Sequence, residues 1–296
     1  MLAVTSLDPA SDTAPHSDRH PIPRLDELEE FYDAVPRNGA RAEAFGPLTL
    51  FVREGQGWPF YARPTLGWDG PGATAADVLR VLERQRELGL PQSFEWVAET
   101  TPGLRAAVGA AGLTVHEHPL LVLADDAPEA AAGADAGAAD VPVRILGVDD
   151  PALPSAVAVP HLAFGEPGTG VGTAGPAELA QAVRVCLADG TVTRTALRIE
   201  AGVAAVAAAV EDGLALCAGQ YQRAGAVCEI VGVGTLPTAR RRGLGLAVTA
   251  ALVEDARSRG VRTVFLSAAD EDVARIYRRA GFRNTATALI AEPAAG

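Results

Sequence analysis

The chain has 296 residues, of which 37 are acidic and 25 are basic, so its formal net charge is −12. About half of the residues (48%) are hydrophobic, which is enough for a sizeable core and excludes a wholly disordered protein. An acidic surface repels phosphate backbones, which argues against general nucleic-acid binding. No apolar stretch is long enough to span a bilayer, and the first residues lack the pattern of a signal peptide. We therefore expect a cytoplasmic protein that does not contact membranes.

The cysteines give no sign of a cross-linked or metal-bound scaffold. Cys186, Cys217 and Cys228 are an odd number and lack CxxC or Cys/His spacing. A disulfide framework or a structural zinc site is therefore not expected. We expect three small buried residues and no metal site.

The first half of the chain is predicted to form a domain at 24–123, preceded by a flexible tail at 1–23 that mixes Ser, Asp, Pro and His without periodicity. Helical and extended patterns alternate through this domain. Its predicted helices are at 24–34, 75–88 and 104–111. Its predicted strands are at 48–55, at 60–61 with their neighbours, at 93–98 and at 113–124, the last being one long strand or a pair.

A segment at 124–140 separates the two halves. It repeats Ala, Asp and Gly and contains no large apolar residue, so it cannot bury a face against a core. We predict an interdomain linker here.

A second domain is predicted at 141–296, where regular patterns resume. Its longest helix, at 243–260, carries apolar residues at helical spacing and ends at a glycine. The other predicted elements are strands at 141–147, 193–200, 202–212, 213–222, 226–236 and 262–268, helices at 151–163, 178–187 and 270–281, and a Gly-rich loop at 166–176.

The two halves resemble each other in one segment. Residues 98–112 and 268–281 both run from the end of a strand through a helix to a glycine and a further strand, with spacings that differ by one residue. A duplicated fold with a degenerate first copy fits this similarity, the length and the linker.

The most informative motif lies between the strand at 226–236 and the helix at 243–260. Arg240-x-x-Gly243-x-Gly245 follows Pro237 by three residues, and Arg241 and Arg242 add two more cations. The glycines let backbone amides approach a ligand, and a helix N-terminus adds partial positive charge. This combination favours a site for a pyrophosphate.

Together with a second motif, this turn resembles the acyl-CoA-binding signature of the GNAT N-acetyltransferases. The second motif, AADEDVARIYRRAGF, is similar to another signature of that family, a helix with Tyr277 four residues before Gly281-Phe282. Where many members have Asn, this chain has Asp270, and a carboxylate cannot donate the hydrogen bond that Asn supplies. The resemblance covers about residues 141–291.

The resemblance implies an α+β GNAT fold, a mixed and mostly antiparallel sheet flanked by helices, in two tandem copies. It implies that acetyl-CoA is the cosubstrate and that an acetyl group passes to an amine of a small molecule or peptide. The residues that it places at the cofactor are Val233, Gly234 and Thr235 along the pantetheine arm, Arg240, Arg241, Arg242, Gly243, Leu244 and Gly245 at the pyrophosphate, and Asp270.

Acyl transfer to an amine needs a base for the ammonium proton and an acid for the leaving thiolate. Tyr277 matches the family's acid, and its alternative is a core aromatic. Glu229, eleven residues before Arg240, matches the glutamate that serves as the base in histone-type members. The alternative is that Glu229 forms a salt bridge at an edge strand and that a chain of water molecules serves as the base. His161 and Glu166 are weaker candidates for acceptor contacts.

Two further readings stay open beside the N-acetyltransferase. One is an acyl-CoA-binding sensor without turnover, and the other is a GNAT-fold enzyme that uses another acyl-CoA or an oxygen acceptor. The first half lacks an Arg-x-x-Gly-x-Gly turn, so we expect it to shape the acceptor pocket or an interface. The acidic balance favours a cationic acceptor, and the chain is expected to be a monomer or a homodimer.

Overall fold

The computed structural model describes residues 25–57, 59–127 and 141–294. The predicted tail at 1–23 and most of the predicted linker at 124–140 lie outside these ranges. The elements of the first half are α1 (Leu25–Arg37), β1 (Ala40–Phe45), β2 (Leu48–Arg53), β3 (Ala62–Pro64), α2 (Ala75–Glu87), β4 (Phe94–Val97), α3 (Leu104–Ala110) and β5 (Leu113–Leu123).

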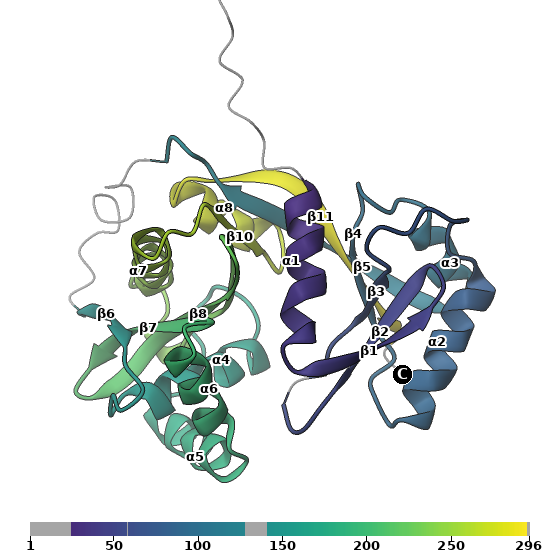
Figure 1. Cartoon of the computed structure of the whole chain (residues 1–296). Helices are drawn as coiled ribbons and strands as arrows, with labels where there is room; N and C mark the ends of the chain where they lie inside the picture. The colour runs from purple at the N-terminus through teal and green to yellow at the C-terminus, as the bar shows by residue number, and fades with distance from the viewer. Residues whose placement is uncertain (1–24, 58, 128–140, 295–296) are drawn as a thin grey trace, which may run out of the picture.

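The second half begins after the undescribed segment at 128–140 (Figure 1). Its elements are β6 (Val143–Leu146), α4 (Leu153–Gly165), α5 (Pro176–Ala188), α6 (Thr191–Glu200), β7 (Ala204–Glu211), β8 (Leu214–Ala224), β9 (Val227–Thr235), the 3₁₀ helix η1 (Pro237–Ala239), α7 (Leu244–Ser258), β10 (Thr263–Ser267), α8 (Glu271–Arg279) and β11 (Phe282–Pro293).

All these strands join one sheet in the order β1-β2-β3-β4-β11-β5-β10-β9-β8-β7-β6. Among the described strands, two neighbouring pairs are parallel, β3 with β4 and β9 with β10, and the rest are antiparallel. The predicted fold class, a mixed and mostly antiparallel sheet flanked by helices, is confirmed.

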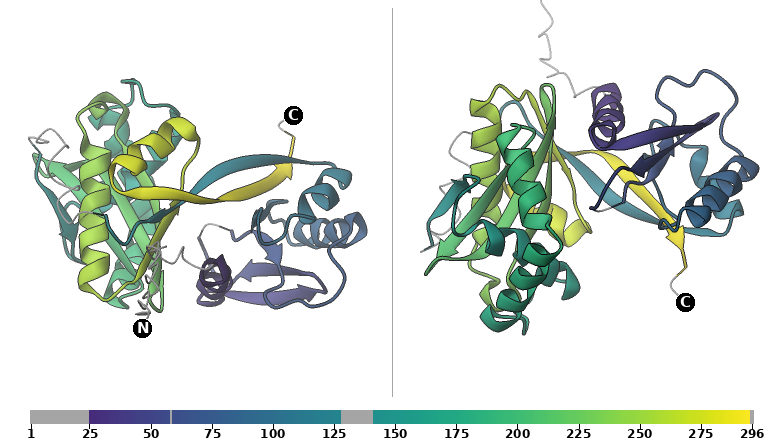
Figure 2. Two further views of the ribbon diagram at one scale, coloured as in Figure 1. Left: turned by 90° about the horizontal axis from the view of Figure 1, so that it is seen from above. Right: turned by 60° about the horizontal axis from the view of Figure 1, so that its bottom comes forward.

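The two halves exchange their last strands. β5 ends the first half but lies between β10 and β11, and β11 ends the second half but lies between β4 and β5. The two strands pair with each other from Phe282 opposite Leu123 to Pro293 opposite Leu113, and Figure 2 shows them running side by side from one half into the other. The sheet is therefore continuous across the molecule, because each half completes the other.

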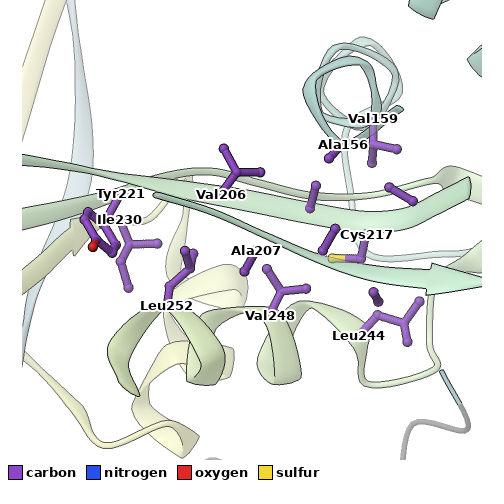
Figure 3. Packing of buried hydrophobic residues seen from close by; sticks show 14 of the residues in the cluster. Ala156, Val159, Val206, Ala207, Cys217, Tyr221, Ile230, Leu244, Val248 and Leu252 are labelled. Atoms are coloured by element: carbon purple, nitrogen blue, oxygen red, sulfur yellow. The ribbon is translucent and has the colours of Figure 1, made fainter. Parts of the chain in front are cut away.

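Helices cover both faces of the second half of the sheet. Figure 3 shows Ala156 and Val159 of α4 on one face, and Leu244 and Val248 of α7 on the other. Successive residues of a strand alternate between these faces. On β9, Ile230 packs with the α7 core, so its neighbour Glu229 lies on the α4 face.

α1 joins the halves on that same α4 face. Phe31 and Tyr32 are buried against Phe265 of β10, with ring centroids 5.0 and 5.5 Å away in edge-to-face geometry. Burying each such side chain stabilises the fold by about 1.5–3 kcal/mol. This apolar contact holds the first half beside β9 and β10.

The structure corrects one element of the prediction. The segment 193–200, expected as a strand, lies in helix α6. Its β-branched Thr and Ile residues favour a strand locally, but Val192, Ala196 and Ile199 repeat at helical spacing and pack together against the core. The strand β1 was not predicted, because its alternating exposed and half-buried residues carry few large apolar side chains.

The other long elements agree with their predicted ranges, and 113–123 is one strand rather than two. Within the described residues, no helix is both long and apolar enough to cross a membrane.

Candidate functional site

The candidate site begins where β9 and β10 separate. These parallel strands pair only over Val227–Glu229 and Thr263–Phe265, whereas β9 continues to Thr235. In the described part of the chain, no strand pairs with this side of β9 beyond Glu229. The last residues of β9 therefore present main-chain groups that an extended ligand can reach.

A bulge shapes the same stretch of β9. The register with β8 shifts between Ala218 opposite Gly234 and Gln220 opposite Val231, so β9 holds one extra residue there. Gly232 takes φ +65°, the left-handed region that favours glycine. The bulge turns Gly234 toward α4, where an added Cβ would lie 2.8 Å from the Cβ of Ala163.

The N-terminus of α7 has no capping side chain. Gly243 at the N-cap has φ +74°, no side chain caps the helix, and its first turn holds no acidic residue. The first amides of a helix lack intrahelical partners and carry partial positive charge. This end of α7 therefore has the properties of an anion-binding site.

The three arginines of the turn have different roles. Arg240 donates to the carbonyl oxygens of Ala163 at 3.0 Å and Gly170 at 3.2 Å, so its side chain holds the loop after α4. Arg242 forms an ion pair with Glu211 at 2.8 Å. Arg241 is exposed and has φ +69°, an unusual value for a residue other than glycine.

Val233, Gly234 and Thr235 are the predicted pantetheine residues at the end of β9. The Thr235 hydroxyl donates to the Cys217 sulfur at 3.2 Å, which places Thr235 on the α7 face. Gly245, in the first turn of α7, would bring an added Cβ to 3.8 Å from the Thr235 hydroxyl. The end of the strand and the start of the helix therefore meet.

Tyr277 of α8 lies close to Cys217. Its ring packs edge-on against Phe282, with 6.2 Å between centroids, and its hydroxyl forms no hydrogen bond within the described ranges. Burial, helped by the neighbouring Cys217, raises the pKa of Tyr277, so the phenol stays protonated at neutral pH. A protonated, uncommitted hydroxyl is available as a proton donor.

Asp270 is the N-cap of α8. Its carboxylate accepts from the Val273 amide at 2.8 Å, so it is already used within the helix end. Its contact with a cofactor stays a prediction.

Glu229 is a buried carboxylate with neutral donors. Its side chain is 6% exposed, and it accepts from the Tyr32 hydroxyl at 3.2 Å and the Gln222 amide at 3.0 Å. Burial, and then the charge of Glu95, raise the pKa of Glu229 to about 7, while these two donors and Arg63 oppose the rise. A carboxylate with this pKa can accept a proton near neutrality.

The charged neighbours of Glu229 come from the first half. Arg63 of β3 is 4% exposed and donates to Glu95 of β4 at 3.2 Å and to Glu29 of α1 at 3.4 Å. Its guanidinium also lies 4.2 Å from the centroid of the Tyr32 ring. The first half therefore sets much of the electrostatic environment of Glu229.

Sequence patterns did not reveal Tyr32, Arg63, Glu95 or Gln222. The first three lie far from Glu229 in the chain, and only the strand exchange and the packing of α1 bring them to it. The alternation along the strand at 213–222 places Gln222 on one face, but no local signal pairs it with Glu229.

A cavity of about 420 Å³ opens beside the bulge on the α4 face. It is lined by Ala156, Val157, Pro160, His161 and Phe164 of α4, Thr191 and Thr195 of α6, Val206, Gly219, Gln220, Val231 and Gly232. His161 therefore reaches a cavity. Glu166 instead accepts from the amides of Thr173 at 2.8 Å and Ala174 at 3.1 Å, and these bonds lower its pKa.

A splayed parallel pair, a bulge and an uncapped helix N-terminus together define an α+β protein with an open strand edge beside a helix end that can hold an anion. Residues 189–282 match the model of the acetyltransferase (GNAT) family, so this segment is a GNAT domain. No curated protein matches the chain.

Several solved structures resemble this protein over nearly the whole chain. A GCN5-related N-acetyltransferase from Kribbella flavida is 24% identical with a TM-score of 0.62, covering 92% of this chain and 95% of its own. A tandem GNAT protein from the clavulanic acid biosynthesis pathway is 16% identical with a TM-score of 0.54, covering 91% and 95%. A putative GNAT acetyltransferase from Novosphingobium aromaticivorans is 18% identical with a TM-score of 0.50, covering 92% and 96%. The GNAT fold is thereby confirmed.

Proposed function

We propose that the chain transfers an acetyl group from acetyl-CoA to the amine of a small molecule or peptide, by direct attack of the amine on the thioester. The observation that carries this proposal is the open N-terminus of α7, which lies where β9 has separated from β10. The family match at 189–282 supports acyl transfer in general.

The residues around the turn fit a CoA pyrophosphate. The left-handed Gly243 leaves the first amides of α7 without a side chain over them, and the uncapped first turn carries no acid to repel a phosphate. Backbone groups of Arg240 to Gly245 would hold the pyrophosphate, and those of Val233 to Thr235 would pair with the pantetheine arm. When bound, acetyl-CoA supplies the activated thioester.

The side chains of the chain would then move two protons. Glu229 accepts the proton that the attacking amine loses, as the new N–C bond forms. The Tyr277 hydroxyl donates a proton to the sulfur as the C–S bond breaks. The amide of Val233, in the bulge, would polarise the thioester carbonyl.

Two observations favour an enzyme over a sensor. The pKa of Glu229 is raised to about 7, and the Tyr277 hydroxyl is uncommitted within the described residues. A module that only binds acyl-CoA requires neither feature.

The test is release of free CoA thiol from acetyl-CoA across a panel of amino acids, peptides, polyamines and aminoglycosides, with binding of acetyl-CoA measured separately by calorimetry. We expect at least one amine to support turnover in the wild type and none in Gly243→Asp. Tight binding without turnover on any acceptor would support the sensor, and absence of binding would overturn the cofactor assignment.

A further inference from the structure

Residues of β8 and β9 that share the α4 face connect the cavity to Glu229. Gln220 pairs with Val231, and both line the cavity. Two residues along each strand, Gln222 pairs with Glu229 and donates to its carboxylate at 3.0 Å. Residues two apart on a strand point to the same face, so the cavity floor leads directly to the buried carboxylate.

Helix α6 covers this path and brings a cation to it. Thr191 and Thr195 line the cavity, and Arg198 follows Thr195 by three residues, close to the same side of the helix. Arg198 donates to the Gln222 amide oxygen at 3.4 Å, so Gln222 lies between Arg198 and Glu229. This contact also orients the amide, because its oxygen faces the cation and its NH₂ faces the carboxylate.

Arg198 has no acidic partner among the residues that the structure describes. It is half-buried, and within the described residues no carboxylate lies within ion-pair distance of its guanidinium; burial lowers its pKa. Arg53 of β2 reaches the same region from the first half, since burial and the charges of Arg198 and Arg194 lower the pKa of Arg53. Arg194 donates to the Asp189 carbonyl at 2.8 Å and forms an ion pair with the Asp189 carboxylate at 3.9 Å. Three cations therefore gather where the halves meet.

The contrast with Arg63 shows what this arrangement lacks. Arg63 is also buried, but Glu29 and Glu95 neutralise it at 3.4 and 3.2 Å. A desolvated cation beside like charges is unfavourable unless an anion offsets it. Around Arg198 itself the described chain supplies only the Gln222 amide oxygen, whereas Arg194 already pairs with Asp189. Arg198 is therefore the cation that an anion of a ligand would offset.

We propose that Arg198 binds a carboxylate of the acceptor, which is therefore an amino acid or a similar zwitterion. This inference rests on the proposed acetyl transfer and names its substrate class. With the carboxylate at Arg198, the amine lies toward Glu229, the side chain at the far end of Gln222. The side chain of the acceptor enters the cavity, whose walls include Val157, Phe164 and Val206, so apolar amino acids fit best.

The test compares an acceptor with and without its carboxylate. Thiol release from acetyl-CoA is measured with leucine and with leucinamide, in the wild type and in Arg198→Gln. We expect the wild type to prefer leucine roughly 10- to 100-fold in kcat/KM, mostly through KM, as for a lost charged hydrogen bond. Arg198→Gln should lose this preference, and Arg198→Lys should restore part of it.

Arg223→Gln is the matched control. Arg223 follows Gln222 on β8 and points to the opposite face, where its Nε donates to the Gly225 carbonyl at 2.7 Å. The Arg223→Gln substitution removes the same positive charge, and the variant should keep the preference for leucine. A wild type that uses leucinamide as well as leucine, or an Arg198→Gln variant that keeps the preference, would overturn the proposal.

A binding measurement separates this inference from the proposed reaction. Calorimetric titration with N-acetylleucine needs no turnover, and we expect binding to the wild type and to Arg223→Gln that is lost in folded Arg198→Gln. Binding with this pattern in a protein that acetylates nothing would keep the anion subsite and overturn the acetyltransferase. Turnover on amines without any such binding would do the reverse.

Discussion

The two halves of the molecule share one order of elements but differ at the start of the equivalent helix. β3–α2–β4–α3–β5 corresponds to β9–α7–β10–α8–β11, and in each the first and second of the three strands are parallel. At α2, Thr74 and Asp77 form a reciprocal capping box that occupies the first amides and adds a negative charge. At α7 neither cap nor acid is present. Of these two equivalent helices, only α7 therefore keeps an open end for a phosphate.

The strands before these helices differ as well. Ala62 pairs with Phe94 in the first half, and Cys228 pairs with Val264 in the second. The next residue is Arg63 in one case and Glu229 in the other. Arg63 is held between two carboxylates, whereas Glu229 has two neutral donors. A degenerate first copy stays a prediction, and the comparison shows that charged residues of the first half reach the carboxylate of the second.

Tyr277→Phe tests the same comparison at the second helix of each half, α3 and α8. Val108 stands four residues before Gly112, as Tyr277 stands four residues before Gly281, and it is fully buried without a donor. Removing only the Tyr277 hydroxyl should lower kcat by about 10²- to 10⁴-fold, the range for a positioned acid, and leave the Kd for acetyl-CoA unchanged. Steady-state kinetics and calorimetry check this, and full activity would return Tyr277 to a packing role.

Gly243→Asp makes the start of α7 resemble that of α2. A negative side chain over the first amides should weaken acetyl-CoA binding on the order of 100-fold, because it competes with the phosphate for the same partial charges. Gly243→Asn is the control, since Asn tolerates the left-handed conformation without a charge. Calorimetry should show a much smaller loss for Asn, and equal losses would mean that backbone strain is responsible.

Glu229→Gln asks what the buried carboxylate does to stability. Its folded pKa of about 7 exceeds the unfolded value near 4.5, so ionisation destabilises the fold as pH rises between these values. The variant, measured against the wild type, should gain about 2 kcal/mol at pH 8 relative to pH 5. Urea denaturation at the two pH values checks this. A pH-independent difference would show that Glu229 titrates normally.

Glu95→Gln and Tyr32→Phe should shift the pH profile in opposite directions. Removing the Glu95 charge lowers the pKa of Glu229, so the rise of kcat/KM should move to lower pH; removing the Tyr32 donor should move it higher. Glu117→Gln, at an exposed carboxylate on β5, is the control. Parallel shifts, or none, would show that the first half does not tune the base.

Sequence patterns were sufficient to predict the features that depend only on residues close together in the chain. The turn at Arg240–Gly245, the helix after it and the alternation that separates Glu229 from Ile230 are all local, and the structure has each of them. The prediction of a strand at 193–200 was wrong. The β-branched residues of this segment favour a strand, whereas the spacing of its apolar residues and their packing against the core favour the helix α6. The strand exchange has no local sequence signal, because the patterns of β5 and β11 predict strands without indicating which strands they pair with. Tyr32, Arg63 and Arg53 were missed for that reason.

The exchange of β5 and β11 also constrains how the chain matures. During synthesis the first half emerges without the strand that belongs between β4 and β5, and it cannot close its sheet until Phe282–Pro293 has been made. Pairing over so long a sequence separation is slow, and unpaired strand edges attract other chains meanwhile. A fragment that starts at residue 141 would lack β5 and leave β10 without its neighbour. Each half depends on a strand from the other, so we expect neither half to complete its sheet when it is expressed alone.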